Sequence, residues 1–354
     1  MSTLTVALAS LGGVVLAGVI AHGAWQARRA GPRRASVAER AEPSASAPRD
    51  GEPEGVADDT ETVASDDSLA SPTARRLSKR LPLRLDALID AIAPLTLEAP
   101  IAGDVVVAHL PAKRHVGSKL MIVEGLDSES GEWQVPAAGR RYGELQAGVQ
   151  LASRTGALNE IEYSEFVQRI QAFADAIGAS VDAPDMLDVM ARARELDAFA
   201  NQHDAQIAVH LHARGTAWSV GYIQQHARRH GFVAGVVPGR LVYPASEEGA
   251  PPVLTLTFDS QAALADEPDR AAVRDVTLAF DVPQTDPGVE PFRAWQAAAQ
   301  ALAVGMDAEI VDDDQRPLST PGFEAIGAEL GALYAALAGR DLAAGTASAR
   351  RLFS

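Results

Sequence analysis

The stretch from Asp307 to Thr320 reads DAEIVDDDQRPLST and places three aspartates, residues 312–314, directly after a short apolar run. Clustered carboxylates can hold a metal ion or act as acids and bases in an enzyme. On a strand, however, consecutive side chains point to opposite faces, so three neighbouring carboxylates cannot converge on one ion without a tight loop. Thr320 and Pro321 also predict a helix start, with a hydroxyl N-cap and proline in the first turn. We therefore interpret the stretch as a strand, a polar turn and a capped helix, with no catalytic or metal-binding role.

Four histidines form two pairs with the spacing of neighbours on one face. His210 and His212 lie two apart on an expected strand, and His226 and His230 lie four apart on an expected helix. Four imidazoles could bind zinc. Zinc sites usually add cysteine or carboxylate ligands held by further partners, which this pattern lacks. The spacing favours histidines on two separate surfaces, and a zinc site of unknown use remains the alternative.

Composition excludes several functional classes. The chain has 354 residues, a formal net charge of −16 and no cysteine. An acidic protein lacks the basic surface that general nucleic-acid binding needs, and without cysteine there is no disulfide, thiolate zinc site or thiol nucleophile. The sequence also contains no phosphate-binding P-loop, no strand-to-helix G-x-G-x-x-G and no G-x-S-x-G nucleophile turn. We therefore expect no cofactor and no enzymatic activity.

The N-terminus carries the pattern of a membrane anchor. Residues 4–25 contain no Asp, Glu, Lys or Arg, and that length of helix can cross a bilayer. Arginines follow at positions 28, 29, 33 and 34, which predicts that the rest of the chain is cytoplasmic. A cleaved signal peptide, the alternative, would carry its positive charge before the apolar run. We expect a single-pass anchor in residues 1–27, with residues 4–25 in the bacterial inner membrane.

The remainder divides into a linker and two folded regions. Residues 28–80 are rich in Pro, Ala, Ser and acidic residues and poor in large apolar ones, as is typical of a disordered linker. Residues 81–202 and 203–340 each show strand-like and helical apolar patterns in the same order. That order predicts an α+β fold, mostly antiparallel sheet backed by helices, and an internal duplication. Residues 341–354 are expected to be a flexible tail.

Five short motifs within residues 204–338 resemble, in the correct order, the C-terminal domain of the ZipA family of cell division proteins. They are VHLHARG from Val209, GFVAG from Gly231, VTLAFDVP from Val276, the D-D-Q-R turn and the Thr-Pro helix start. In the turn and helix start the matching residues are Asp313, Asp314, Gln315, Arg316, Thr320 and Pro321. The N-terminal anchor and acidic linker also fit that architecture. Residues 81–202 have no counterpart in a plain ZipA.

The resemblance implies a division protein without catalytic activity that tethers FtsZ filaments to the inner membrane. In that family the sheet face without helices takes up the C-terminal tail of FtsZ. Because Ile207, Val209 and Leu211 form the apolar set that needs a core, their neighbours should point to the binding face. The partner-binding residues expected from this parity are Ala208, His210, Val237, Thr255, Thr257 and Ala279. This face is smaller and more polar than the family's.

The alternative is a membrane-anchored scaffold that does not bind the FtsZ tail. Its sheet faces would associate with each other or with another envelope protein.

Overall fold

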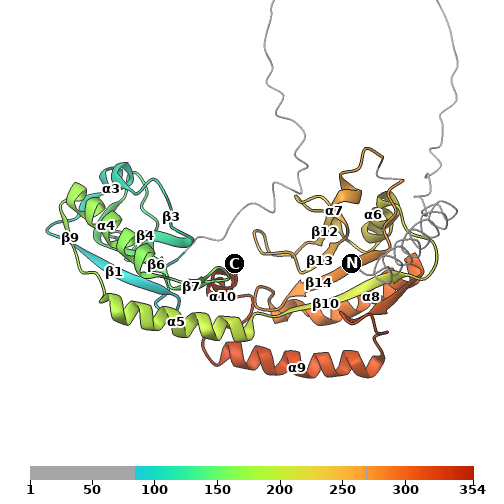
Figure 1. Ribbon diagram of the computed structural model, residues 1–354. Helices are drawn as coiled ribbons and strands as arrows, with labels where there is room; N and C mark the ends of the chain where they lie inside the picture. Colours follow the sequence, from blue (N-terminus) through green and yellow to red (C-terminus); the bar gives the residue numbers. More distant parts are fainter. Residues whose placement is uncertain (1–83, 268–269) are drawn as a thin grey trace, which may run out of the picture.

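The computed structural model describes residues 84–267 and 270–354 (Figure 1). The expected anchor at residues 4–25 and the linker at residues 28–80 lie outside the described residues. Within the described ranges, no helix is long and apolar enough to span a membrane.

The first lobe, residues 84–203, contains an antiparallel sheet with strand order β3-β4-β6-β1-β9, and β2 and β5 pair with β6 and β4. A separate hairpin joins β7 to β8. The elements are β1 (Asp90–Leu97), β2 (Ile101–Ala102), α3 (Gly103–His109), β3 (His115–Val116), β4 (Lys119–Asp127), β5 (Trp133–Gln134), β6 (Arg141–Gln150), β7 (Ala152–Ser153), β8 (Gly156–Ala157), α4 (Glu160–Ile177), β9 (Ala179–Val181) and α5 (Met186–His203).

The second lobe, residues 204–340, contains a six-stranded antiparallel sheet with the order β11-β12-β13-β14-β10-β15. Its elements are β10 (Gln206–Ala213), α6 (Val220–Arg229), β11 (Val233–Ala234), β12 (Arg240–Tyr243), β13 (Leu254–Thr257), α7 (Ser260–Ala263), β14 (Asp275–Asp281), the 3-10 turn η1 (Pro287–Val289), α8 (Pro291–Met306), β15 (Ala308–Val311) and α9 (Thr320–Ala338). The α+β architecture expected from the sequence is confirmed.

The two lobes share one topology. Four strands in the first lobe lie in the order β4-β6-β1-β9, and their counterparts in the second lobe lie in the order β13-β14-β10-β15. All of these neighbours are antiparallel. Along the chain, each set reads strand, helix, two strands, helix, strand, which is a split β-α-β arrangement. This shared order is the arrangement that an internal duplication predicts.

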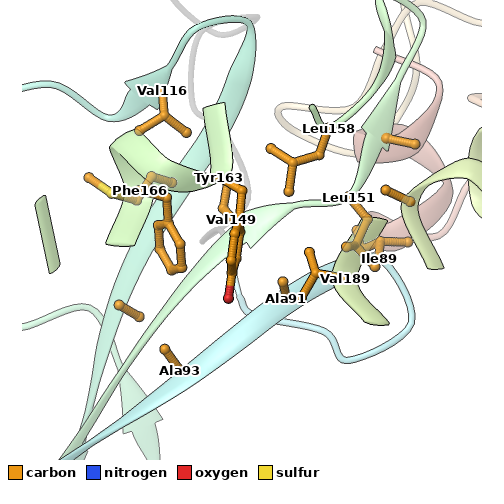
Figure 2. Close-up of a cluster of buried hydrophobic side chains, with 14 of the residues drawn as sticks. Ile89, Ala91, Ala93, Val116, Val149, Leu151, Leu158, Tyr163, Phe166 and Val189 are labelled. Carbon is orange, nitrogen blue, oxygen red and sulfur yellow. The ribbon is translucent and has the colours of Figure 1, made fainter. Parts of the chain in front are cut away.

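Helix α4 shows how local sequence builds the first core. The Asn159 side chain accepts from the backbone of Glu162, whose carboxylate accepts from the backbone of Asn159, so the helix begins with a capping box. Gly178 ends the helix in the left-handed conformation, at φ 71°. Figure 2 shows Tyr163 and Phe166 on the side of the sheet that carries Ala91, Ala93 and Val149. The apolar residues that recur along this helix at spacings of four, three and four are buried, and they are Phe166, Ile170, Phe173 and Ile177.

Two tryptophans anchor the second core. Trp218 and Trp295 are fully buried, and their indole N–H groups donate to the carbonyls of Met306 and Leu278 at 2.8 Å and 3.0 Å. Each ring therefore buries a large apolar surface without leaving a polar atom unpaired. Gly231 follows the end of α6 at φ 84°, the glycine position expected after a helix.

The C-terminal segment corrects the sequence analysis. In place of the flexible tail expected at residues 341–354, the chain forms α10 (Ala347–Leu352). Leu352 and Phe353 are fully buried and belong to the core of the first lobe. Arg351 donates to both carboxylate oxygens of Asp90, at 2.9 Å and 2.5 Å. The last residues of the chain thus complete the core of the first lobe, which residues 84–203 form.

Two helix details also differ from expectation. The N-cap of α9 is Ser319, not Thr320, and the Ser319 side chain forms no cap hydrogen bond. A leucine is usually placed on the apolar side of a helix, but Leu187 in the first turn of α5 is 79% exposed. In α9 most of the stability must therefore come from packing, since its Phe323, Leu330 and Leu337 are buried while its start lacks a cap.

Helix α9 links the lobes, because its Leu333 and Tyr334 pack against both cores. Burial, with a smaller contribution from Asp286, raises the pKa of Tyr334 to about 12. Because the pKa of Tyr334 is higher in the folded state, the neutral phenol contributes stability below the unfolded pKa of about 10. This contribution is lost as the pH rises from 10 through the folded pKa of about 12.

Tyr334→Phe should therefore reduce the stability that the protein loses as the pH rises above about 10. The Tyr334 hydroxyl is buried and has no hydrogen-bond partner among the described residues, so at pH 7 the variant should be as stable as the parent or slightly more so. Between pH 10 and 12, the parent should lose about 1–2 kcal/mol more than the variant in urea titrations. The exposed Tyr243→Phe is the matched control, and equal alkaline losses in parent and Tyr334→Phe would contradict the prediction.

Candidate peptide-binding face

The second lobe has one sheet face that its helices do not cover, which we call the open face. Alternation along β10 places Val209 and Leu211 in the core and leaves Ala208 and His210 on the opposite side. Thr255 and Thr257 of β13 and Ala279 of β14 share that side. The strand register brings these residues together in adjacent rows.

The first row includes residues of three central strands, β13, β14 and β10. Thr255 lies opposite Ala279, and Ala279 lies opposite Ala208. Small side chains make this row a flat floor. Ala279 is only 6% exposed, so the backbone and its neighbours already shield it from water. A peptide could approach the backbone closely here but would bury little apolar side-chain surface.

The second row is polar. Thr257 lies opposite Thr277, and Thr277 lies opposite His210. One ring nitrogen of His210 hydrogen bonds to Thr277 Oγ1 at 3.0 Å, and the other contacts Asp313 Oδ1 at 2.9 Å. Both ring nitrogens are therefore engaged, which holds the imidazole against the sheet.

Val237, the sixth expected residue, lies apart from these rows. It is 55% exposed in the turn between β11 and β12, and its carbonyl accepts from Arg240 N at 3.1 Å. Arg240 in turn lies opposite Thr257 and donates to Thr255 Oγ1 at 3.4 Å. Arg240 is a residue of the open face that the parity argument did not select.

The aspartates at residues 312–314 form a tight turn. Oδ1 of Asp312 accepts from the backbone N–H groups of Asp314 and Arg316, at 3.0 Å and 2.8 Å. The Arg316 guanidinium also reaches Asp312 and Asp314. The hydrogen bond from the Arg316 backbone is the main cause that lowers the pKa of Asp312 below its ordinary value. The carboxylates thus stabilise a turn, as the sequence analysis expected.

The histidines do not gather around one point. His212 contacts Asp275 at 2.7 Å, while His226 and His230 lie on and just after α6. Within the part of the chain that the structure describes, no group of three or more His, Asp or Glu side chains could hold a metal ion.

The corresponding face of the first lobe is not open. Leu85 N donates to Glu124 Oε1 at 3.0 Å, and a Cβ added to Gly148 would lie 2.3 Å from Leu85 Cδ2. The chain segment before β1 therefore lies across β4 and β6 and occupies this face. Of the two large sheets in the described ranges, only that of the second lobe offers the central part of its helix-free face to a partner.

One buried polar cluster escaped the sequence analysis. Lys119 is 1% exposed, and its Nζ donates to Ser118 Oγ at 2.8 Å and Thr155 Oγ1 at 3.1 Å. Burial lowers the pKa of Lys119, partly offset by the charge of Glu162. Because Ser118 Oγ donates to Glu162 Oε1 at 3.0 Å, its proton points away from the amine. The cluster joins β4, the start of α4 and the β7–β8 hairpin, a structural role that no short motif signals.

Comparison with known proteins adds no assignment. The sequence matches no protein-family model and no curated protein.

Proposed function

We propose that the chain is a membrane-anchored cell division protein that tethers FtsZ filaments to the inner membrane. In this proposal residues 4–25 form the anchor, residues 28–80 form the linker, and the open face takes up the FtsZ C-terminal tail. The observation that carries the proposal is this helix-free face, floored by Ala208 and Ala279 and bordered by threonines. It lies in the region whose ordered motifs resemble the ZipA family.

Two details support the choice of lobe. Several residues of the motifs have identifiable structural roles. In GFVAG, a Cβ at Gly235 would lie 2.9 Å from the Arg240 carbonyl oxygen, and Phe232 is buried. The D-D-Q-R turn places Asp313 against His210 of the open face. The first lobe, by contrast, covers its own face with Leu85.

Binding by one open face should be weak. The open face is small and mostly polar, so we expect a dissociation constant in the micromolar range or above for one tail. Many tails along one filament would raise the apparent affinity through multivalency.

The test is titration of the full-length protein with FtsZ and with tail-deleted FtsZ. Thr257→Glu places a carboxylate on the open face, opposite Arg240, where the fold can accept it but a docking peptide must desolvate it. We expect this variant to weaken FtsZ binding at least tenfold. Thr96→Glu, at an exposed position on the first sheet, is the matched control. Ala279 is too buried for this purpose, because a charge there would test folding.

Equal binding to FtsZ and tail-deleted FtsZ, or no binding at high micromolar concentration, would refute the proposal. Either result would favour the alternative of a membrane-anchored scaffold with another protein partner.

A further inference from the structure

The first lobe contains a gap in the pairing of its edge strand. On its outer side, β4 pairs with β3 only at Lys119 and Leu120 and with β5 only at Gly125 and Leu126. Met121 N adds one further bond, to the carbonyl of Arg114 at 2.7 Å. No strand of the described residues covers the outer side of β4 between Met121 and Gly125. We call this gap the slot, and its length is about 13 Å at about 3.3 Å per residue.

The backbone groups inside the slot face outward. The N–H of Met121 points to β3, and the N–H of Asp127 points to Glu132 beside β5. Because alternate residues of a strand bond to the same side, the N–H and C=O of Val123 also point outward. Proteins usually pair, cover or charge such an edge. No described residue pairs with these two backbone groups of Val123, so they are available to an added strand, which is a common mode of peptide recognition.

The slot also has an apolar hollow. A cavity of about 60 Å³ opens beside Met121 and Val123 and is bordered by Leu110, Pro111 and the 43% exposed Val135. A cavity that binds benzene measures about 150 Å³. The hollow is therefore too small for an aromatic ring and suits one short branched aliphatic side chain.

The end of the slot nearest β3 is positively charged. Lys113 and Arg114 border the same cavity, and both are exposed. Neither side chain forms an ion pair with a carboxylate among the described residues, where Arg140, Arg154 and Arg169 all do so. Two unpaired cations beside an apolar hollow favour a ligand that carries a carboxylate next to an aliphatic side chain.

The direction of β4 determines at which end of the slot the ligand carboxylate would lie. Because β4 runs from the β3 end to the β5 end, an antiparallel peptide would run toward Lys113 and Arg114. At that end the backbone of Arg114 already occupies the next pairing position, on Met121. An added strand must stop there, which suits a chain that ends. A second copy of this protein is a poor occupant, since its own β4 edge is equally recessed between β3 and β5.

We propose that the slot binds the extended C-terminal end of another polypeptide. In this arrangement the peptide backbone pairs with Val123, a branched aliphatic side chain enters the hollow, and the terminal carboxylate lies beside Lys113 and Arg114. This site lies on a different lobe from the open face and does not depend on FtsZ binding.

The probe is a fluorescently labelled peptide, Ala-Thr-Val-Thr-Val with a free C-terminal carboxylate, titrated by anisotropy against the full-length protein. One comparison peptide has a C-terminal amide, and another is N-methylated on its central residues and cannot donate backbone hydrogen bonds. Arg114→Glu reverses the charge at the slot. Arg293→Glu makes the same change on an exposed arginine of α8 and is the matched control.

We expect the carboxylate peptide to bind, and both the amide and Arg114→Glu to raise the dissociation constant at least tenfold. N-methylation should abolish binding, and Arg293→Glu should leave it unchanged. Equal binding of the amide would assign the slot to an internal segment and overturn the proposal. Binding of the N-methylated peptide, unchanged binding by Arg114→Glu, or no binding of the carboxylate peptide at 1 mM, roughly the weakest affinity such a titration detects, would also overturn it.

Discussion

Arg351→Met should lower the free energy of unfolding by about 3–5 kcal/mol, because it leaves the carboxylate of Asp90 buried without a countercharge. Asp90 and Arg351 are 1% and 8% exposed, and the guanidinium donates to both carboxylate oxygens. Arg351 also donates to the carbonyl of Arg84 at 2.7 Å. Chemical denaturation at pH 7 measures the loss. Arg293→Met, which breaks an exposed ion pair with Glu290, should cost less than about 1 kcal/mol.

The pH dependence of this variant identifies the cause. Burial raises the pKa of Asp90, against the opposing hydrogen bond and charge of Arg351. An acid with a raised folded-state pKa stabilises the fold below its unfolded value and loses that contribution as the pH rises through the folded value. Without Arg351 the pKa of Asp90 is raised further. The loss of unfolding free energy in Arg351→Met should therefore be greatest at pH 7 and smaller at about pH 4.5.

A second substitution should recover part of the loss. Asp90→Asn in the Arg351→Met background removes the buried charge, so the double variant should be more stable than Arg351→Met alone at pH 7. A double variant as unstable as the single one would show that the loss comes from packing of the arginine side chain.

Local patterns in the sequence predicted most of the second lobe. The alternation in β10 identified its core and open sides, because one face of an antiparallel sheet is solvated. The run of aspartates was recognised as a turn because neighbouring strand residues cannot share a ligand. Gly231 opens the GFVAG motif directly after α6 and takes the left-handed conformation of a glycine that follows a helix, a local feature that depends on residues close in sequence.

Features that depend on distant residues were missed. Nothing near Lys119 shows that Thr155 and Ser153 surround its amine, because these residues meet only in the folded lobe. The burial of Ala279 depends on neighbouring strands. Arg240 lies on the open face because β12 pairs with β13 in the register that places Arg240 opposite Thr257. The alternation of residues along the other three strands could not predict that register.

The C-terminal segment was missed for a related reason. The sequence after Leu337 is short, is rich in small residues and contains several charged ones, which is typical of a flexible tail. Its partners lie more than 250 residues earlier in the chain, with Arg351 paired to Asp90 and Ser348 hydrogen-bonded to Asp86. Only the closed fold reveals that the tail is part of a core.

Deleting residues 341–354 should therefore unfold the first lobe while leaving the second lobe folded. The deletion removes the buried side chains of Leu342, Leu352 and Phe353 and leaves Asp90 unpaired. Removal of one buried phenylalanine alone costs about 3–5 kcal/mol, and these losses together approach the whole stability of a typical domain. The core around Trp218 and Trp295 contains no residue of the deleted segment.

Hydrogen exchange resolved by peptide separates the two lobes. After the deletion, peptides from β1, β4 and β6 should lose protection, and peptides from β10 and β14 should keep it. Phe353→Ala is a milder form of the same change and should destabilise the same lobe. Ser354 is exposed, so removing it alone serves as the control and should leave protection unchanged. Full protection of β1 after the deletion would contradict the prediction, because it would show that the first lobe folds without the end of the chain.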